Sequence, residues 1–146
     1  MTDAPADADP LAFVRGIFHA APFVAALGIE PRAIAPGRCE SVLVLRPDHL
    51  QHTGQAHAGV LTTLADHTAG AAAQTLVRGD GVILTAELKI SLLRPAQGER
   101  LVCIAQVVKA GRQLMFTEAE VLCERDGQSV TVARLSATMA VARPRD

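Results

Sequence analysis

The sequence predicts an α+β domain in which a curved antiparallel sheet wraps around one long central helix, with a short helix before it. Residues 57–77 are rich in alanine and apolar on most faces, which is typical of a helix enclosed by other elements. From residue 82 onward apolar side chains recur with a period of two, which indicates strands. With 146 residues, 49% of them hydrophobic, the chain can bury one core. We therefore expect a single domain over residues 9–146, behind a frayed tail at residues 1–8.

Two short helices and two strands are expected before the central helix. An Asp-Pro pair at residues 9–10 is a typical N-cap and first helical position, and apolar residues follow it at helical spacing. Residues 22–28 begin with Pro and end with Gly, as one or two further helical turns would. Residues 29–34 and 39–45 then have the pattern of strands, joined through the Pro-Gly pair at 36–37.

Four strands are expected after the central helix, arranged as a meander. They cover residues 82–92, 101–109, 113–124 and 129–141, and Asp-Gly at 126–127 is a strong signal for a tight hairpin. In the first of these strands, one face is expected to carry Val82, Leu84, Ala86, Leu88, Ile90 and Leu92, and the other Thr85, Glu87, Lys89 and Ser91.

The composition argues against several classes of partner. The net charge is −1, with 14 basic and 15 acidic residues spread along the chain, so neither nucleic acid nor a membrane surface is an expected partner. The three cysteines have no CxxC spacing and the histidines no ligand spacing, so we expect reduced thiols and no metal site. The N-terminus lacks the basic region of a secretory signal. These features favour a cytoplasmic protein.

Asp66 is the first candidate for chemistry. It is the only Asp, Glu, Lys or Arg between Asp48 and Arg78. A carboxylate in so apolar a segment is costly unless it is paired, hydrogen-bonded or used. By residue type alone, a catalytic carboxylate and a buried carboxylate bonded to a neighbouring amide are about equally good readings. A glycine-bearing turn at residues 54–59 lies just upstream, where backbone amides could meet a ligand.

The segment from Gln51 to Asp66, QHTGQAHAGVLTTLAD, resembles the hotdog-fold acyl-CoA thioesterases of the phenylacetate-degradation (PaaI-like) type. That family has an Asn or Gln, a Gly, a His-Gly-Gly turn, and an acid nine residues after the His. The stretch ELKISLLRP at 87–95 and the Gly-Arg pair at 111–112 are also similar to the family pattern. The sequence departs from it at Ala58, where the first Gly of the turn is usual, and at Gly70, where a hydroxyl is expected.

The resemblance implies a role for each residue of the motif. Asp66 would be the catalytic carboxylate, acting either as general base on water or as nucleophile through an anhydride. The backbone N–H of Ala58, which with Gly59 begins the helix, would polarise the thioester carbonyl. Gln51 would orient water or the carboxylate. His57 would either hydrogen-bond near the thioester or brace the turn.

The resemblance also implies the substrate and the assembly. An acyl-CoA or aryl-CoA thioester would be hydrolysed without a metal or cofactor, coenzyme A being part of substrate and product. Lys89, Arg94 and Arg112 could meet its phosphates, although basic residues at strand ends and turns are usually solvated. The site would lie across the interface of a homo-oligomer, either a dimer or a dimer of dimers. The acyl group is not indicated.

Two other functions remain open at this stage. Ala58 and Gly70 leave room for a hotdog module that binds acyl-CoA without catalysis. The adjacent Asp66 and His67 are the residue types that a hotdog hydratase or dehydratase would use, although His67 is expected on another face of the helix.

Overall fold

The computed structural model describes residues 10–145, and the expected tail at residues 1–8 and the cap at Asp9 lie outside this range. Two short helices come first, α1 (Pro10–Ala20) and α2 (Pro22–Leu27). Helix α2 ends at Gly28, whose φ of +85° is the left-handed conformation that glycine adopts without strain. Both helices are where the sequence predicts them.

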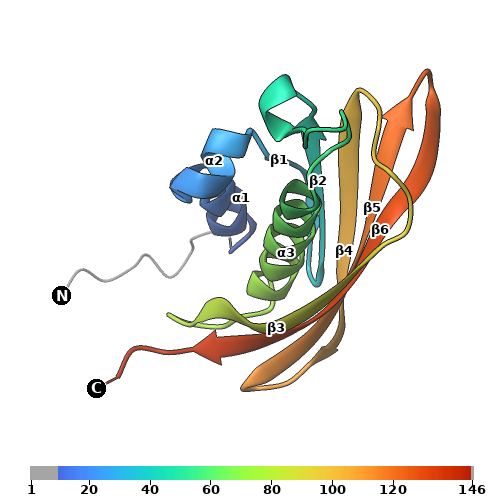
Figure 1. Cartoon of the computed structure of the whole chain (residues 1–146). Coiled ribbons are helices and arrows are strands. Elements are labelled where there is room, and N and C mark those ends of the chain that lie inside the picture. Colours follow the sequence, from blue (N-terminus) through green and yellow to red (C-terminus); the bar gives the residue numbers. More distant parts are fainter. Residues whose placement is uncertain (1–9, 146) are drawn as a thin grey trace.

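Six strands form a single antiparallel sheet (Figure 1). Its order across the sheet is β1-β2-β4-β5-β6-β3. A short 3-10 helix, η1 (Pro47–His49), and the long helix α3 (Ala58–Gln74) separate the first two strands from the rest. The strands are β1 (Glu30–Ala35), β2 (Arg38–Val44), β3 (Val82–Leu92), β4 (Arg100–Ala110), β5 (Leu114–Arg125) and β6 (Gln128–Ala142).

Helix α3 lies on the concave side of the curved sheet, and α1 and α2 lie on the side of α3 away from β4 and β5 (Figure 1). Its inward residues are small, so the strands approach it closely; Ala65, Ala69 and Ala72 are completely buried. Phe18 of α1 closes this core from the helical side and is also fully buried. The predicted α+β class and the enclosed central helix are confirmed.

The predicted meander is correct for β4, β5 and β6 and wrong for β3. Strand β3 pairs with β6 at one edge of the sheet, and β4 pairs with β2. The connection from β3 to β4, residues 93–99, therefore crosses the end of the sheet instead of forming a hairpin. Periodicity shows which residues share a face of a strand, but it carries no information on which strand lies beside it. The Asp126–Gly127 hairpin is confirmed, with φ values of +51° and +76°.

The predicted alternation along β3 is also wrong in its first half. A β-bulge at Ala86 leaves this residue without a partner, because Thr85 pairs with Met139 and Glu87 with Thr138. The extra residue reverses the alternation, so that Thr85 faces α3 and Leu84 points outward with 57% of its surface exposed. Beyond the bulge Leu88 and its apolar neighbours face the helix side, as predicted.

The two edges of the sheet differ. Strand β1 is short, and α1 packs against it. Strand β3 has 11 residues, and no strand of the described chain pairs with its outer edge. Leu84, Leu88 and Leu92 of this strand are 57%, 37% and 50% exposed. An open edge with exposed leucines is a surface that favours pairing with another strand.

Candidate active site

Asp66 lies two turns into α3, where the helix faces β3, and it is only partly buried. The hydroxyl of Thr85 donates a hydrogen bond of 2.7 Å to Oδ1 of Asp66. Met139 pairs with Thr85 across the sheet, and its sulfur atom lies 3.5 Å from the hydroxyl oxygen of Thr85. The carboxylate is therefore held at one oxygen, and no residue among 10–145 donates a hydrogen bond to the other.

Thr85 is the residue that the sequence reading missed. Simple alternation assigns it to the outer face of β3 with Glu87 and Lys89, and only the bulge at Ala86 turns it toward Asp66. Bulges often re-aim a side chain beside a functional site. The structure therefore places a hydroxyl from the neighbouring strand beside Asp66.

The N-terminus of α3 presents two polar groups. His57 is the N-cap, and its Nδ1 accepts a hydrogen bond of 2.8 Å from the N–H of Gly59. Because Nδ1 is the acceptor, the ring proton of neutral His57 is on Nε2, which points away from this bond. Ala58 is the first residue of the helix, so its N–H has no acceptor within α3. The N–H groups of Ala58 and Gly59 both lie at the positive end of the helix dipole.

Gly59 has a steric reason for lacking a side chain. A Cβ atom at this position would lie 3.0 Å from Nδ1 of His57. Since that distance is shorter than a normal contact, the capping side chain would have to move. Gly59 therefore permits the His57 cap, which fixes the orientation of the first amides of the helix.

Gln51 lies in a tight loop beside the start of α3. Its backbone N–H donates to the carbonyl of Gln55 at 2.8 Å, and its side-chain Nε2 donates to Oε1 of Gln55 at 3.5 Å. Gln51 and Ala58 share a groove of about 320 Å³ with the end of β3. Its other lining residues are Gln55, Ala56, Leu61, Leu92, Leu93, Arg94, Pro95 and Ala96. This groove combines an apolar wall with the polar side chains of Gln51, Gln55 and Arg94.

Within one chain, Gln51 and Ala58 at the groove lie apart from Asp66 and Thr85. Ala58 and Asp66 are eight positions apart on a straight helix, which corresponds to about 12 Å along its axis at 1.5 Å per residue. Asp66 does not line the groove that contains Gln51 and Ala58. A single thioester carbonyl cannot reach both the Ala58 amide and the Asp66 carboxylate of the same chain.

The three expected phosphate-binding residues also lie apart. Arg94 lines the groove, but its guanidinium donates to the carbonyl of Thr131 at 2.9 Å. Lys89 lies on the outer face of the sheet in a hollow that also includes Glu118. Arg112 lies in the turn between β4 and β5. The structure places only Arg94 beside the motif residues.

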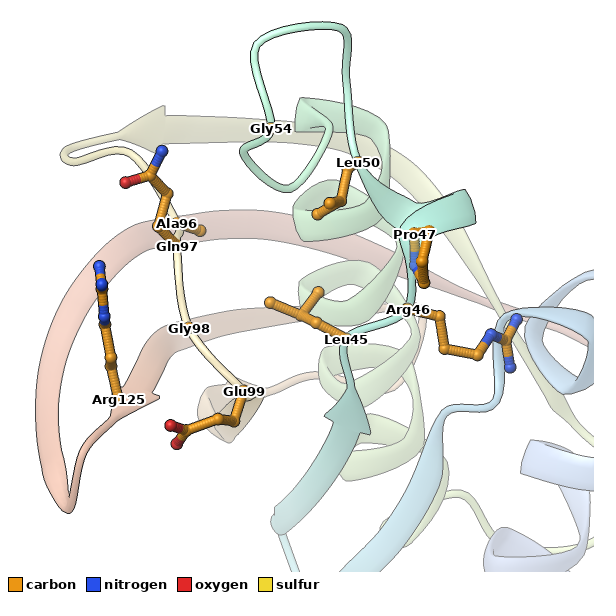
Figure 2. Close-up of a pocket in the computed structure, with 10 residues that line it drawn as sticks. All are labelled: Leu45, Arg46, Pro47, Leu50, Gly54, Ala96, Gln97, Gly98, Glu99 and Arg125. Atoms are coloured by element: carbon orange, nitrogen blue, oxygen red, sulfur yellow. The ribbon is translucent and has the colours of Figure 1, made fainter.

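A second cavity, of about 460 Å³, lies beside the groove and shares Ala96 with it (Figure 2). The side chains of Gln97, Glu99 and Arg125 lie on one side of it, and Arg46 points away from them toward the N-terminal helices (Figure 2). The cavity thus carries charges of both signs.

His67 packs against α1 and not toward the groove. Its ring meets that of Phe18 edge to face, with 4.6 Å between the centroids, and its buried Nε2 has no hydrogen-bond partner among residues 10–145. Burial lowers the pKa of His67, and the nearby Asp66 charge only partly opposes this. This environment gives no support to a His-Asp pair acting on substrate.

The cysteines are buried thiols. Burial raises the pKa of Cys39 and of Cys103 to about 12 and also raises that of Cys123. All three are free of disulfides and are protonated at neutral pH. They are therefore unsuited to act as nucleophiles.

Residues 10–145 contain neither a cluster of metal ligands nor a helix that could span a membrane. No group of three His, Cys, Asp or Glu residues in this range could hold a metal ion. None of its helices is long and apolar enough to cross a membrane.

Comparison with known proteins identifies relatives in sequence. The model of the thioesterase superfamily matches residues 53–130, just over half of the chain. Human acyl-coenzyme A thioesterase 13 is 28% identical over 101 residues, covering 68% of this chain and 71% of the relative. A relative from Caenorhabditis elegans is 30% identical over 101 residues, and the match spans 59% of its length.

Solved structures show the same architecture. A thioesterase family protein from Silicibacter pomeroyi is 34% identical, with a TM-score of 0.89 over 91% of this chain and 98% of that one. A variant of the phenylacetic acid degradation protein PaaI from Thermus thermophilus is 32% identical, with a TM-score of 0.69 over 82% and 97% of the two chains. The family match, the sheet order and the enclosed helix α3 agree, and the chain therefore belongs to the thioesterase superfamily and has its hotdog fold.

Proposed function

We propose that this protein hydrolyses an acyl-CoA or aryl-CoA thioester to the free acid and coenzyme A, at a site shared by two copies of the chain. The observation that carries the proposal is Asp66, held at one oxygen by Thr85 and partly exposed on a helix whose first amide has no acceptor within the helix. The name of acyl-coenzyme A thioesterase 13, a relative of this chain, supports the same substrate class.

The distance of about 12 Å along α3 between Ala58 and Asp66 supports the participation of a second copy. In an antiparallel pair of β3 strands, a two-fold axis near Leu88 places the start of β3 in each copy beside the end of β3 in the other. Thr85 and Asp66 lie at the start, and the groove with Ala58 lies at the end. The exposed leucines of β3 support this pairing, because a second strand would cover them. Each dimer then has two sites.

In the proposed reaction the thioester carbonyl accepts a hydrogen bond from the Ala58 N–H of one copy, and Asp66 of the other copy acts on it. As general base, the free oxygen of Asp66 takes a proton from water while the water oxygen bonds to the carbonyl carbon. The tetrahedral intermediate then breaks its C–S bond, and the CoA thiolate takes the proton. The alternative is direct attack by the carboxylate, which breaks the C–S bond, releases the CoA thiolate and gives an anhydride. Water then hydrolyses the anhydride to the free acid and the Asp66 carboxylate, and the thiolate takes the proton that this step releases.

The remaining motif residues complete this site. Gln51 directs its side-chain amide at the water or the carboxylate, and His57 holds the turn through its cap on the N–H of Gly59. The leucines of the groove accept the apolar part of the CoA arm, with Arg94 at its rim. Because a thiolate is a good leaving group, one carboxylate and one polarising amide suffice, and the step needs no metal or cofactor besides CoA itself.

The test is replacement of Asp66 by Asn, which keeps the shape of the side chain and removes its charge. Release of free thiol is followed over a panel of aryl, short-chain and long-chain acyl-CoA substrates. We expect kcat to fall by about 10² to 10⁴-fold, which is the usual contribution of a general base. Asp80→Asn, in the exposed turn after α3, is the matched control and should be unaffected.

Unchanged turnover in Asp66→Asn refutes the mechanism. Tight binding of acyl-CoA by the wild-type protein, with no thiol released from any substrate of the panel, supports the non-catalytic alternative that Ala58 leaves open. Loss of the double bond of an enoyl-CoA, followed by absorbance, supports the hydratase alternative.

A further inference from the structure

We infer that His49 is a positioning residue which, with Arg46, ties the loop carrying Gln51 and His57 to the C-terminus of α2. The N-terminal helices thereby set the geometry of one half of the site. The kinetic part of this inference rests on the proposed function, whereas its structural part does not.

The C-terminal carbonyls of α2 are satisfied in two ways. Two of the last four carbonyls, those of Val24 and Ala25, accept hydrogen bonds from backbone N–H groups just beyond the helix. The other two accept from side chains of the loop that follows β2. The carbonyl of Ala26 accepts from the guanidinium of Arg46 at 3.0 Å, and that of Leu27 accepts from Nε2 of His49 at 2.9 Å. The loop and the helix end are therefore joined by side chains, in addition to the intervening strands.

His49 uses both of its ring nitrogens for this purpose. The ring is 1% exposed, and its Nδ1 accepts from the backbone N–H of Arg46 at 3.0 Å. Since Nδ1 accepts, the proton is on Nε2, as the bond to Leu27 requires. A ring that is buried and satisfied at both nitrogens has no atom left for substrate, so it acts only through the loop.

The backbone of His49 completes the link to the site. Its carbonyl accepts a hydrogen bond of 2.9 Å from the N–H of His57, the N-cap of α3. Gln51 follows only two residues later, and Leu50 and Ala56 close the loop through a β-bridge. A shift of His49 must therefore displace Gln51 and the first amides of α3 together. Displacement of a catalytic group by about 1 Å can cost about 10²-fold in rate.

Two substitutions separate the two bonds of the ring. In His49→Gln the terminal amide is as far from the backbone as Nε2, so it can still donate to Leu27. In His49→Asn the amide oxygen lies where Nδ1 does, so it keeps the Arg46 bond and loses the tether to α2. We expect kcat of His49→Asn to fall by about 10 to 100-fold with KM changed by less than about threefold, and His49→Gln to retain most of the wild-type kcat.

The control is His19→Gln, which replaces an exposed histidine of α1 and should leave kcat unchanged. Hydrogen exchange of residues 50–57 is measured on the same proteins, and it should rise in His49→Asn only. If the wild-type protein hydrolyses no substrate, the proposed function fails while the exchange comparison still tests His49. The inference is overturned if hydrogen exchange of residues 50–57 in His49→Asn equals that of the wild type. It is also overturned if His49→Asn and His49→Gln both fold and lose kcat to the same extent.

Discussion

Replacing Thr85 by Val tests whether the bulge in β3 serves the site. Val has nearly the shape of Thr, so it removes the hydroxyl that donates to Asp66 at 2.7 Å and lies 3.5 Å from the Met139 sulfur, while the volume of the side chain is kept. A hydrogen bond to a charged group contributes about 1.5 to 3 kcal/mol net. At about 1.4 kcal/mol for each factor of ten, its loss from the reacting geometry lowers kcat by about 10 to 150-fold.

The assay is steady-state thiol release with the best substrate of the panel, together with thermal unfolding. We expect kcat of Thr85→Val to fall within this range, and thermal unfolding should show that the variant is still folded at the assay temperature. Thr85→Ser keeps the hydroxyl and should retain most of the activity. The reasoning is refuted if Thr85→Val keeps wild-type kcat, or if Thr85→Ser is damaged as severely as Thr85→Val.

Two more predictions follow from contacts around α3. Gly59→Ala should displace the His57 cap, lowering stability by about 1 kcal/mol in urea unfolding and also lowering kcat, and an unaltered urea midpoint would contradict this. For His67, the lowered pKa means that the unfolded chain binds a proton more readily than the folded one, so the stabilising contribution is complete above about pH 6.5 and is lost as the pH falls below it. His67→Phe removes the titrating group and keeps the contact with Phe18, so its urea midpoint should fall less between pH 7 and pH 5 than that of the wild type. Equal falls in the urea midpoints of the two proteins would show that His67 is not responsible.

The elements themselves were predictable because their signals are local. The alanine-rich segment forms α3, Gly28 ends α2, and the Asp-Gly pair at 126–127 forms a hairpin, each for a reason contained in a few adjacent residues. Asp66 was singled out in the same way, as a lone charge in an apolar helix. It lies on α3 beside β3 and is less buried than its sequence neighbours indicate, and its role in catalysis stays a prediction.

The misses have a common physical cause. The position of β3 beside β6, the bulge at Ala86 and the approach of Thr85 to Asp66 are all pairings between segments far apart in the chain. Alternation along one strand is unchanged by the identity of its neighbour, and a one-residue bulge reverses which face it presents. His49 was passed over because its partner, the carbonyl of Leu27, is a backbone group that no sequence motif marks.

The sequence by itself therefore determined the fold class and the central helix, which depend on local periodicity, and it marked Asp66 as a candidate site residue through the cost of a charge among apolar residues. Only the tertiary structure decided which groups surround that carboxylate: the Thr85 hydroxyl from β3, the groove about 12 Å away at the start of α3, and the anchoring of the loop by His49. The reason is that hydrogen bonds and grooves are made by residues close in space, and their positions depend on the packing of the whole sheet around α3.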